Sequence, residues 1–469
     1  MSFQLSPDVD KNKIFLVKHS QLKGRLDTVF YHPKYRANEE AIKNSKWGYE
    51  KISHTARRIA DGPFGSDLKV DEYQLEGNPL LRVSNIRTGE VEGNLVYISD
   101  EKQEQLKRSK VYPNDVLLTK AGAVLGYSAV FPESLREGNI TSHLVIITCR
   151  DGIDPHYLSH FFRSNVGQLQ IYRWGNKSTR PELNTSEVES ILVTTPPPDV
   201  QFKIVERLNA AYTAKKQKEE ESQRLLDSID DYLLSELGIN LLEPEENTIQ
   251  NRVFYRKLSE VSGGRFDPNN YQNERLEAIN SLKNGIFPVK KLCEIVAFRS
   301  IKTNEISEET VYVGMENITS NTGEIVTTNE KDSISSASIF MKNDVLFPKL
   351  RPYLNKVYCA EEEGICSTEF HVLHSNSECN EFIANFLRSR VVVSQTKCLT
   401  SGNTLPRLQL EDINKFLIPI PPLEKQIETV DRITTIRTQA KQLRQAAAAE
   451  LEQAKQEVEA MILGEGNKA

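Results

Sequence analysis

With 469 residues, of which 38% are hydrophobic and 26% charged, the chain is long enough to form two or more domains with separate cores. This composition excludes a disordered or fibrous protein. The net charge of −6 argues against a protein whose whole surface binds nucleic acid, although basic side chains can still gather locally. No apolar run reaches the ~18 residues of a membrane span, and the start of the chain is not typical of a signal peptide. We therefore expect a cytoplasmic protein that does not contact the membrane.

The first segment, residues 12–198, is predicted to be a mixed α+β globular domain. Short apolar runs such as LVYISD, DVLLTK and HLVIITC, separated by Gly, Pro and Asn, indicate strands joined by turns. The run DPHYLSHFFRSNVGQLQIYRW has apolar positions three and four apart after an Asp-Pro start, which predicts one helix.

A different pattern follows in residues 199–239. After TTPPPDV, the chain contains no Gly or Pro until Gly238, so we expect one long central helix. At ~1.5 Å per residue, roughly 38 residues form a rod of about 57 Å.

The second half of the chain repeats this plan. Residues 250–423 are predicted to form a second mixed domain, and residues 424–464 a C-terminal long helix. Near the domain starts, GRLD is repeated as GRFD, and NDVLLTK at 114–120 returns as NDVLFPK at 343–349. From Pro181 and Pro406 onward the two copies keep a constant shift of 225 residues.

The long helices are predicted to pair as an antiparallel coiled coil, which would relate the two domains by a pseudo-twofold axis. In the C-terminal helix, apolar residues recur at alternating steps of three and four, as in a coiled-coil seam. The apolar residues expected on the partner-binding helices are Leu208, Leu225, Ile229, Leu233, Ile433, Ile436 and Leu443.

The residue patterns of enzymes and metal sites are missing from the sequence. There is no GxxxxGK[ST] phosphate loop, and the six cysteines include no Cys-x-x-Cys pair. His156 and His160 are four apart on a predicted helix but have no evident third ligand. We therefore expect no catalytic residue, no metal and no cofactor held by this chain.

Local basicity gives the stronger signal. Residues 163–180 and the matching residues 388–407 each contain four Lys or Arg and no acidic residue. Both windows include Gly-Asn, which predicts a tight turn. Such surfaces suit DNA, because Lys and Arg neutralise phosphates while Arg and Asn can also contact base edges. The simpler interpretation, solvent-exposed surface beside the long helix, remains open.

Two mixed domains, each followed by a proline step and a long helix, resemble the DNA specificity subunit of type I restriction-modification systems. The motifs that carry the resemblance are ARRIADGPFGSDL, NDVLLTK, WGNKSTRPELN and IPIPPLEKQ. The resemblance implies two target-recognition domains that bind double-stranded DNA. It also implies a non-catalytic subunit whose helices bind two methyltransferase subunits, which hold S-adenosylmethionine, with motor-nuclease subunits added to the complex.

On this interpretation each domain reads one half of a bipartite target, and the halves should differ because the copies diverge in their middles. The residues expected to contact DNA are Gly62, Phe64, Ser66, Lys120, Arg173, Asn176, Lys177, Arg180, Lys349, Arg351, Lys397, Asn403 and Arg407. One alternative is a non-enzymatic coiled-coil adaptor or scaffold that binds protein or carbohydrate. Another is a lone nuclease, for which the sequence offers no metal cluster.

Overall fold

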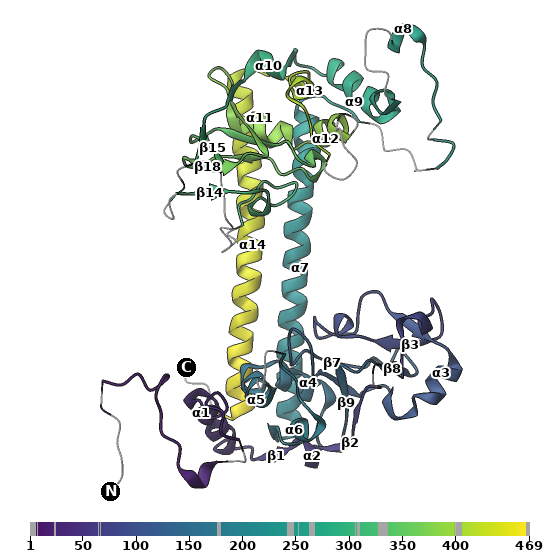
Figure 1. Ribbon diagram of the computed structural model, residues 1–469, viewed down its shortest axis with the longest axis vertical. Helices are drawn as coiled ribbons and strands as arrows, with labels where there is room; N and C mark the ends of the chain where they lie inside the picture. The colour runs from purple at the N-terminus through teal and green to yellow at the C-terminus, as the bar shows by residue number, and fades with distance from the viewer. Residues whose placement is uncertain are drawn as a thin grey trace. The chain divides into compact units, whose positions relative to one another are not determined.

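The chain forms two compact units, shown in the computed structural model of Figure 1. Unit 1 comprises residues 1–217 and 446–469, and unit 2 comprises residues 218–445. Both units combine helices with strands, so the predicted mixed class is confirmed. The structure describes residues 6, 8–22, 25–63, 65, 67–175, 180–241, 248–251, 253–261, 268–304, 306, 310–326, 336–397, 399 and 406–465.

The two long helices are present. Helix α7 spans Pro198–Glu236 and α14 spans Leu423–Leu463. Each helix ends at a glycine in the left-handed conformation, Gly238 (φ 65°) and Gly464 (φ 71°). The N–H after each glycine donates a 2.9 Å bond to the carbonyl five residues earlier. This glycine cap ends both helices in the same way.

Each unit contains the start of one long helix and the end of the other. In unit 1, one apolar cluster joins the globular part to Ile204 and Leu208 of α7 and to Val458 and Ile462 of α14. In unit 2 the corresponding cluster contains Leu233, Leu237, Val430 and Ile433. Polar contacts accompany both clusters, at Arg207–Glu457 (2.7 Å), Ser222–Ala440 (2.9 Å) and Lys425–Glu236 (2.5 Å). The sequence-based boundaries treated each helix as a separate segment, whereas the structure divides each helix between the two units.

A four-stranded antiparallel sheet lies at the centre of each globular part. The order is β2-β9-β6-β7 in unit 1 and β12-β19-β16-β17 in unit 2. The strands of unit 1 are β2 (Ala56–Asp61), β6 (Val116–Thr119), β7 (Ser128–Val130) and β9 (Leu144–Cys149). Those of unit 2 are β12 (Ala297–Arg299), β16 (Val345–Pro348), β17 (Tyr358–Cys359) and β19 (Phe370–His374).

A second sheet in each unit contains a parallel pair, β3 with β8 and β14 with β18. The copies differ here, because the orders are β4-β3-β8-β5 and β13-β15-β18-β14, so the additional strand joins opposite edges. In unit 1 the strands are β3 (Asn78–Leu81), β4 (Val96–Ile98), β5 (Lys110–Val111) and β8 (Gly138–Ile140). In unit 2 they are β13 (Lys302–Thr303), β14 (Tyr312–Val313), β15 (Ala337–Phe340) and β18 (Gly364–Ser367).

The apolar runs VLLT and VLFP are continuous because β6 and β16 are buried on both faces. In unit 1, Val116 and Leu118 pack against helix α4 (Pro155–Arg163), whereas Leu117 packs against the second sheet. In unit 2, helix α11 (Asn380–Leu387) covers β16 in the same way. The central sheet is therefore the middle of three layers in each unit.

Short elements complete both units, and β1 pairs with β10 as β11 pairs with β20. Unit 1 adds α1 (Pro33–Lys43), β1 (Tyr49–Lys51), α2 (Ile52–Thr55), α3 (Asp100–Gln105), α5 (Asn165–Gly175), α6 (Thr185–Glu189) and β10 (Leu192–Thr194). Unit 2 adds α8 (Leu258–Val261), α9 (Asn273–Lys283), β11 (Val289–Lys291), α10 (Leu292–Ile295), α12 (Arg390–Lys397), α13 (Leu410–Ile413) and β20 (Leu417–Pro419). None of the described helices is both long and apolar enough to cross a membrane.

The repeated Asn-Asp pair before β6 and β16 forms a structural turn. Asn114 and Asn343 adopt left-handed φ values of 70° and 67°, which asparagine tolerates better than most residues. Asp115 and Asp344 are 2% and 0% exposed. Each carboxylate accepts a 2.9 Å bond from the backbone N–H three residues earlier. The NDVL motif is therefore repeated because it begins the central strand of both units.

The predicted single helix over residues 154–174 is wrong, because Ser164 divides it. Ser164 has an extended ψ of 158°, and its hydroxyl accepts a 3.2 Å bond from the N–H of Gly167. The serine thereby caps the N-terminus of α5, and this interaction competes with a continuous helix. The corresponding region of unit 2 is likewise two helices, α11 and α12.

A buried glutamine links the start of each long helix to the globular part. Gln201 and Gln426 are 1% and 0% exposed. Each Nε2 donates to the carbonyl of the proline five residues earlier, at 2.8 and 2.9 Å. Each Oε1 accepts from the N–H of Asp154 or Cys379, the residue before α4 or α11. The proline step is thus held against the helix that covers the central sheet.

We expect His160 to make the stability of unit 1 sensitive to acid. Its ring bonds to Asn209 of α7 (3.1 Å) and stacks on Tyr212, and burial lowers its pKa from 6.5 to about 4. Because the unfolded chain binds this proton first, stability is lost as the pH falls below 6.5. We expect a cost of about 1–2 kcal/mol between pH 7 and pH 5. Urea unfolding of the wild type and His160→Gln at both pH values measures it, and an identical pH dependence would contradict this assignment.

Candidate nucleic-acid interface

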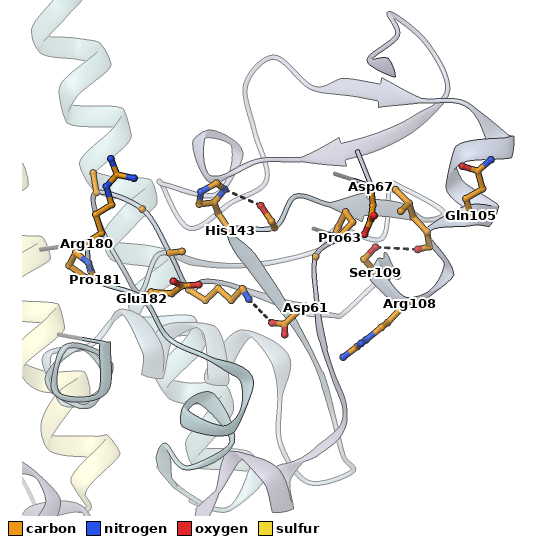
Figure 2. Close-up of a pocket in the computed structure, with 17 residues that line it drawn as sticks. Asp61, Pro63, Asp67, Gln105, Arg108, Ser109, His143, Arg180, Pro181 and Glu182 are labelled. Atoms are coloured by element: carbon orange, nitrogen blue, oxygen red, sulfur yellow. Dashed lines mark hydrogen bonds and ion pairs between the residues drawn. The ribbon is translucent and has the colours of Figure 1, made fainter. Parts of the chain in front are cut away.

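Unit 1 has a surface hollow of about 990 Å³ beside the ends of its central strands (Figure 2). Its wall combines residues that follow β2 and β6, residues that precede β5 and β9, and the segment at 180–182. The basic residues of the wall are Arg108, Lys120, His143 and Arg180, and the acidic residues are Asp61, Asp67 and Glu182. The hollow is therefore polar and lined by charges of both signs.

Gly62 lies where the chain leaves β2 and enters this hollow. A Cβ at this position would be 2.1 Å from the carbonyl oxygen of Thr141, so only glycine fits. This close approach explains the first glycine of the DGPFGS motif.

Lys120 is the centre of a junction at the end of β6. Its backbone N–H donates to the carbonyl of His143 (2.9 Å), and its carbonyl accepts from the N–H of Leu183 (2.8 Å). Its side chain is 13% exposed, with Nζ 3.0 Å from a carboxylate oxygen of Asp61. These bonds hold together segments that are far apart in sequence, and we call this arrangement the strand-end junction of unit 1.

Unit 2 has the same backbone junction around Lys349. The N–H of Lys349 donates to the carbonyl of Glu369 (2.7 Å), and its carbonyl accepts from the N–H of Leu408 (2.9 Å). The side chain donates to the carbonyl of Thr368 (2.7 Å), and burial lowers the pKa of Lys349. Lys120 and Lys349 therefore occupy equivalent positions.

The side chains around the two junctions differ in charge. His143 of unit 1 corresponds to Glu369 of unit 2, because both carbonyls accept from the junction lysine. Glu182 corresponds to Arg407, because each forms the β-bridge beside its junction. Arg407 donates to the Glu369 carboxylate at 2.9 and 3.1 Å, which lowers the pKa of Glu369. A common backbone arrangement thus presents different chemistry in each unit.

Several predicted DNA-contact residues lie at these junctions, and others cannot be placed. Arg180 is exposed at the hollow, and Arg351 is exposed one residue beyond the bridge of unit 2. Lys397 is the last residue of α12. Outside the described residues are Phe64, Ser66, Asn176, Lys177 and Asn403.

Arg173 was expected to contact DNA, but the structure places its side chain inside unit 1, where it has a structural role. Its residue exposure is 6%, and its guanidinium is paired with Glu39. Its Nε donates to the carbonyl of Phe30 (2.9 Å), and the guanidinium stacks over the ring of Phe30. Moving it to a phosphate would leave the Glu39 charge without this partner.

The prediction that seven apolar residues of the long helices bind partner subunits needs correction for four of them. Leu208, Leu233, Ile433 and Ile436 are at most 7% exposed, so they are buried within the chain itself. Leu225, Ile229 and Leu443 are partly buried. An apolar seam identifies buried helix positions but not the molecule that covers them.

Two exposed apolar residues on the long helices were missed. Phe202 of α7 is 65% exposed, and Ile427 of α14 is 47% exposed. They are 225 residues apart, which is the shift of the repeat, and each lies in the first turns of its helix. The sequence signal that could have found them is the apolar residue at the same position of both copies.

Among the described residues, no group of three or more His, Cys, Asp or Glu side chains is arranged to hold a metal ion. The Nε2 atom of His160, one of the two histidines considered as ligands, bonds to Asn209 (3.1 Å).

Comparison with known proteins finds a family model that matches part of this chain. Residues 283–453 match the family model described as the type I restriction modification DNA specificity domain. The Escherichia coli type I restriction enzyme EcoDI specificity subunit is 23% identical over 294 residues, which cover 60% of this chain and 62% of that protein. The Escherichia coli EcoBI specificity subunit is 30% identical over 164 residues, or 34% of this chain and 33% of that protein.

The fold is also similar to that of a solved chain. A structure described as showing complex assembly and conformational transition of the type I R-M system has a TM-score of 0.51 and 16% identity. The match covers 90% of this chain and 98% of that chain. The aligned regions of the two curated relatives span less than two thirds of their own length. The predicted resemblance to type I specificity subunits is confirmed by these matches.

Proposed function

We propose that this chain, with its type I DNA specificity domain over residues 283–453, is a non-catalytic subunit that reads a bipartite DNA target. The observation that carries the proposal is the pair of strand-end junctions. Their backbone bonds are equivalent, but His143 and Glu182 in one are replaced by Glu369 and Arg407 in the other. Two DNA-binding domains, here called readers, that share a backbone arrangement but carry different polar side chains suit a target whose two halves differ in sequence.

The exposed cations beside the junctions support a role in DNA binding. Arg108 and Arg180 at the hollow of unit 1, and Arg351 in unit 2, are of a residue type that can bond to a phosphate or to a base edge. A single reader of this size contacts only a few base pairs, which gives little discrimination within a genome. Two readers at a constant separation multiply their discrimination.

The long helices supply the separation and the partner-binding surface in this proposal. We infer that α7 and α14 pair as an antiparallel coiled coil and relate the two readers by a pseudo-twofold axis. The exposed, equivalent positions of Phe202 and Ile427 suit two copies of one partner, which we assign as methyltransferase subunits. S-adenosylmethionine would be held by those subunits. Motor-nuclease subunits would complete a cytoplasmic complex.

Selection from random double-stranded DNA tests the proposal. The chain with its methyltransferase subunits is expected to enrich fragments that contain two short, different motifs separated by an unread spacer of constant length. A protein or carbohydrate adaptor built on the same helices would enrich no motif. Enrichment of a single uninterrupted motif would leave DNA binding intact but contradict the two-reader arrangement.

A further inference from the structure

An exposed apolar segment precedes the globular part in each half of the chain. The sequence IFLVK at 14–18 returns as VFYRK at 253–257, a shift of 239 residues. Both segments alternate in the same way, with exposed first, third and fifth residues and half-buried second and fourth residues. The exposed apolar side chains are Ile14 (56%) and Leu16 (49%), and Val253 (63%) and Tyr255 (89%).

The buried side of each segment is fixed by the chain itself. The ring of Phe15 packs edge-on against His32, and Arg36 donates to the carbonyl of Leu16 (3.3 Å). In the second copy, Arg256 lies over the ring of Phe254 and donates to Asn273 Oδ1 of α9 (2.6 Å). One side of each segment is thus held by contacts with the rest of its unit, and the neighbouring apolar residues face solvent.

These residues belong to no helix and to no sheet in the described part of the chain. Single exposed apolar residues are ordinary on protein surfaces, but here the same alternating set occurs at the start of both copies. Extended segments with alternating apolar residues can add as a strand to a partner's sheet, where the outward side chains enter pockets. The pattern therefore indicates a docking segment.

Comparison of the two copies indicates the partner. The second sheets and the strand-end junctions differ between the copies, as expected of surfaces that read different DNA. A surface that meets the same protein twice must instead be alike in both copies. The segments meet this condition in length, spacing and exposure.

Charge defines the partner surface further. Residues 11–18 and the equivalent residues 250–257 each include three basic residues and no acidic residue. A complementary groove would be apolar and rimmed by acidic groups. DNA fits these segments less well, because outward Ile, Leu and Val side chains make no bond to phosphate.

We propose that residues 14–18 and 253–257 are docking segments for two copies of the methyltransferase subunit, one at each segment. This inference rests on the proposed function, because it assigns the partner through the type I complex. Docking buries apolar side chains that the isolated chain leaves in water, and the basic residues beside them orient the segment in an acidic groove.

Leu16→Glu, Tyr255→Glu and the double variant test the inference in the full-length chain. Each places a carboxylate where an apolar pocket is expected, at a position exposed enough to leave folding unchanged. We expect each single variant to bind one methyltransferase subunit normally and the second about 25-fold more weakly. Titration and native mass spectrometry should show two subunits bound to the wild type, one to each single variant and none to the double variant at the same concentration.

Leu75→Glu and Leu410→Glu are matched controls, because both leucines are exposed in the same units outside the segments. The controls should bind two methyltransferase subunits. If the wild type and the double variant both bind two methyltransferase subunits, the assignment of the docking segments is wrong while the proposed function stands. If the double variant binds two but loses affinity for DNA, the segments contact DNA instead. A wild type that binds no methyltransferase subunit overturns the proposed function and this inference together.

Discussion

Replacing Asp344 by alanine is expected to lower the free energy of unfolding of unit 2 by about 3 kcal/mol. Asp344 is fully buried and accepts bonds from Arg299 Nε (2.8 Å) and the N–H of Met341 (2.9 Å). His374 Nδ1 is 3.1 Å from the same carboxylate. The variant would leave a largely buried guanidinium without its counter-charge and the backbone turn without its acceptor.

The equivalent change in unit 1, Asp115→Ala, is a matched comparison. Asp115 accepts from the N–H of Tyr112 (2.9 Å) and from the hydroxyl of Thr148, and the described residues form no ion pair with it. We expect a smaller cost of about 1–2 kcal/mol, because neutral donors are less costly to leave unpaired than a cation.

Urea unfolding followed by hydrogen exchange measures both effects, because exchange at β6 and β16 separates unit 1 from unit 2. The larger loss should appear at β16 in the Asp344 variant. Equal losses in the two variants would show that the turn bond, and not the buried charge of Arg299, determines the cost.

The predictions that the structure confirms rest on interactions between residues close together in the sequence. A long run without Gly or Pro after a proline step predicts a helix, and α7 and α14 both follow this rule. The strand expected at DVLLTK is present as β6, and its repeat forms β16. Both strands follow a turn in which Asn is left-handed and Asp accepts the nearby N–H. Local rules could also have located the break at Ser164, since serine is a preferred helix cap.

The failures concern contacts between residues far apart in sequence. Arg173 was counted as a surface cation, but its partner Glu39 lies on α1, 134 residues earlier. The residue ranges predicted for the globular domains ended where the long helices begin, whereas residues 446–469, with the end of α14, group with unit 1. A sequence window shows how many charged and apolar residues it contains. Whether one of those side chains can bind DNA or a partner depends on its burial and on its contacts within the fold.

The largest effect on function is expected from removing the exposed cations of one unit at a time. Arg108→Ala with Arg180→Ala should relax the selection of one half-site by 10-fold to 100-fold and leave the other half unchanged. Arg351→Ala with Arg407→Ala should relax only the other half. Each double variant should also reduce the slope of log affinity against log salt by about 1, because in each pair one arginine is assigned to a phosphate, which contributes ~0.9, and the other to a base edge.

Arg57→Ala and Lys415→Ala provide controls for the general loss of positive charge. Arg57 and Lys415 are exposed cations of units 1 and 2 that pair with Asp151 and Asp412, and they are not part of either strand-end junction. Selection from random DNA should return the full wild-type target for both controls.

The two double variants together decide between two arrangements. If both units shared one binding surface, either double variant would relax the selection of both half-sites. Loss of one half at a time requires that each junction reads its own part of the target, which is the arrangement that explains why the backbone plan is repeated while its charged side chains differ.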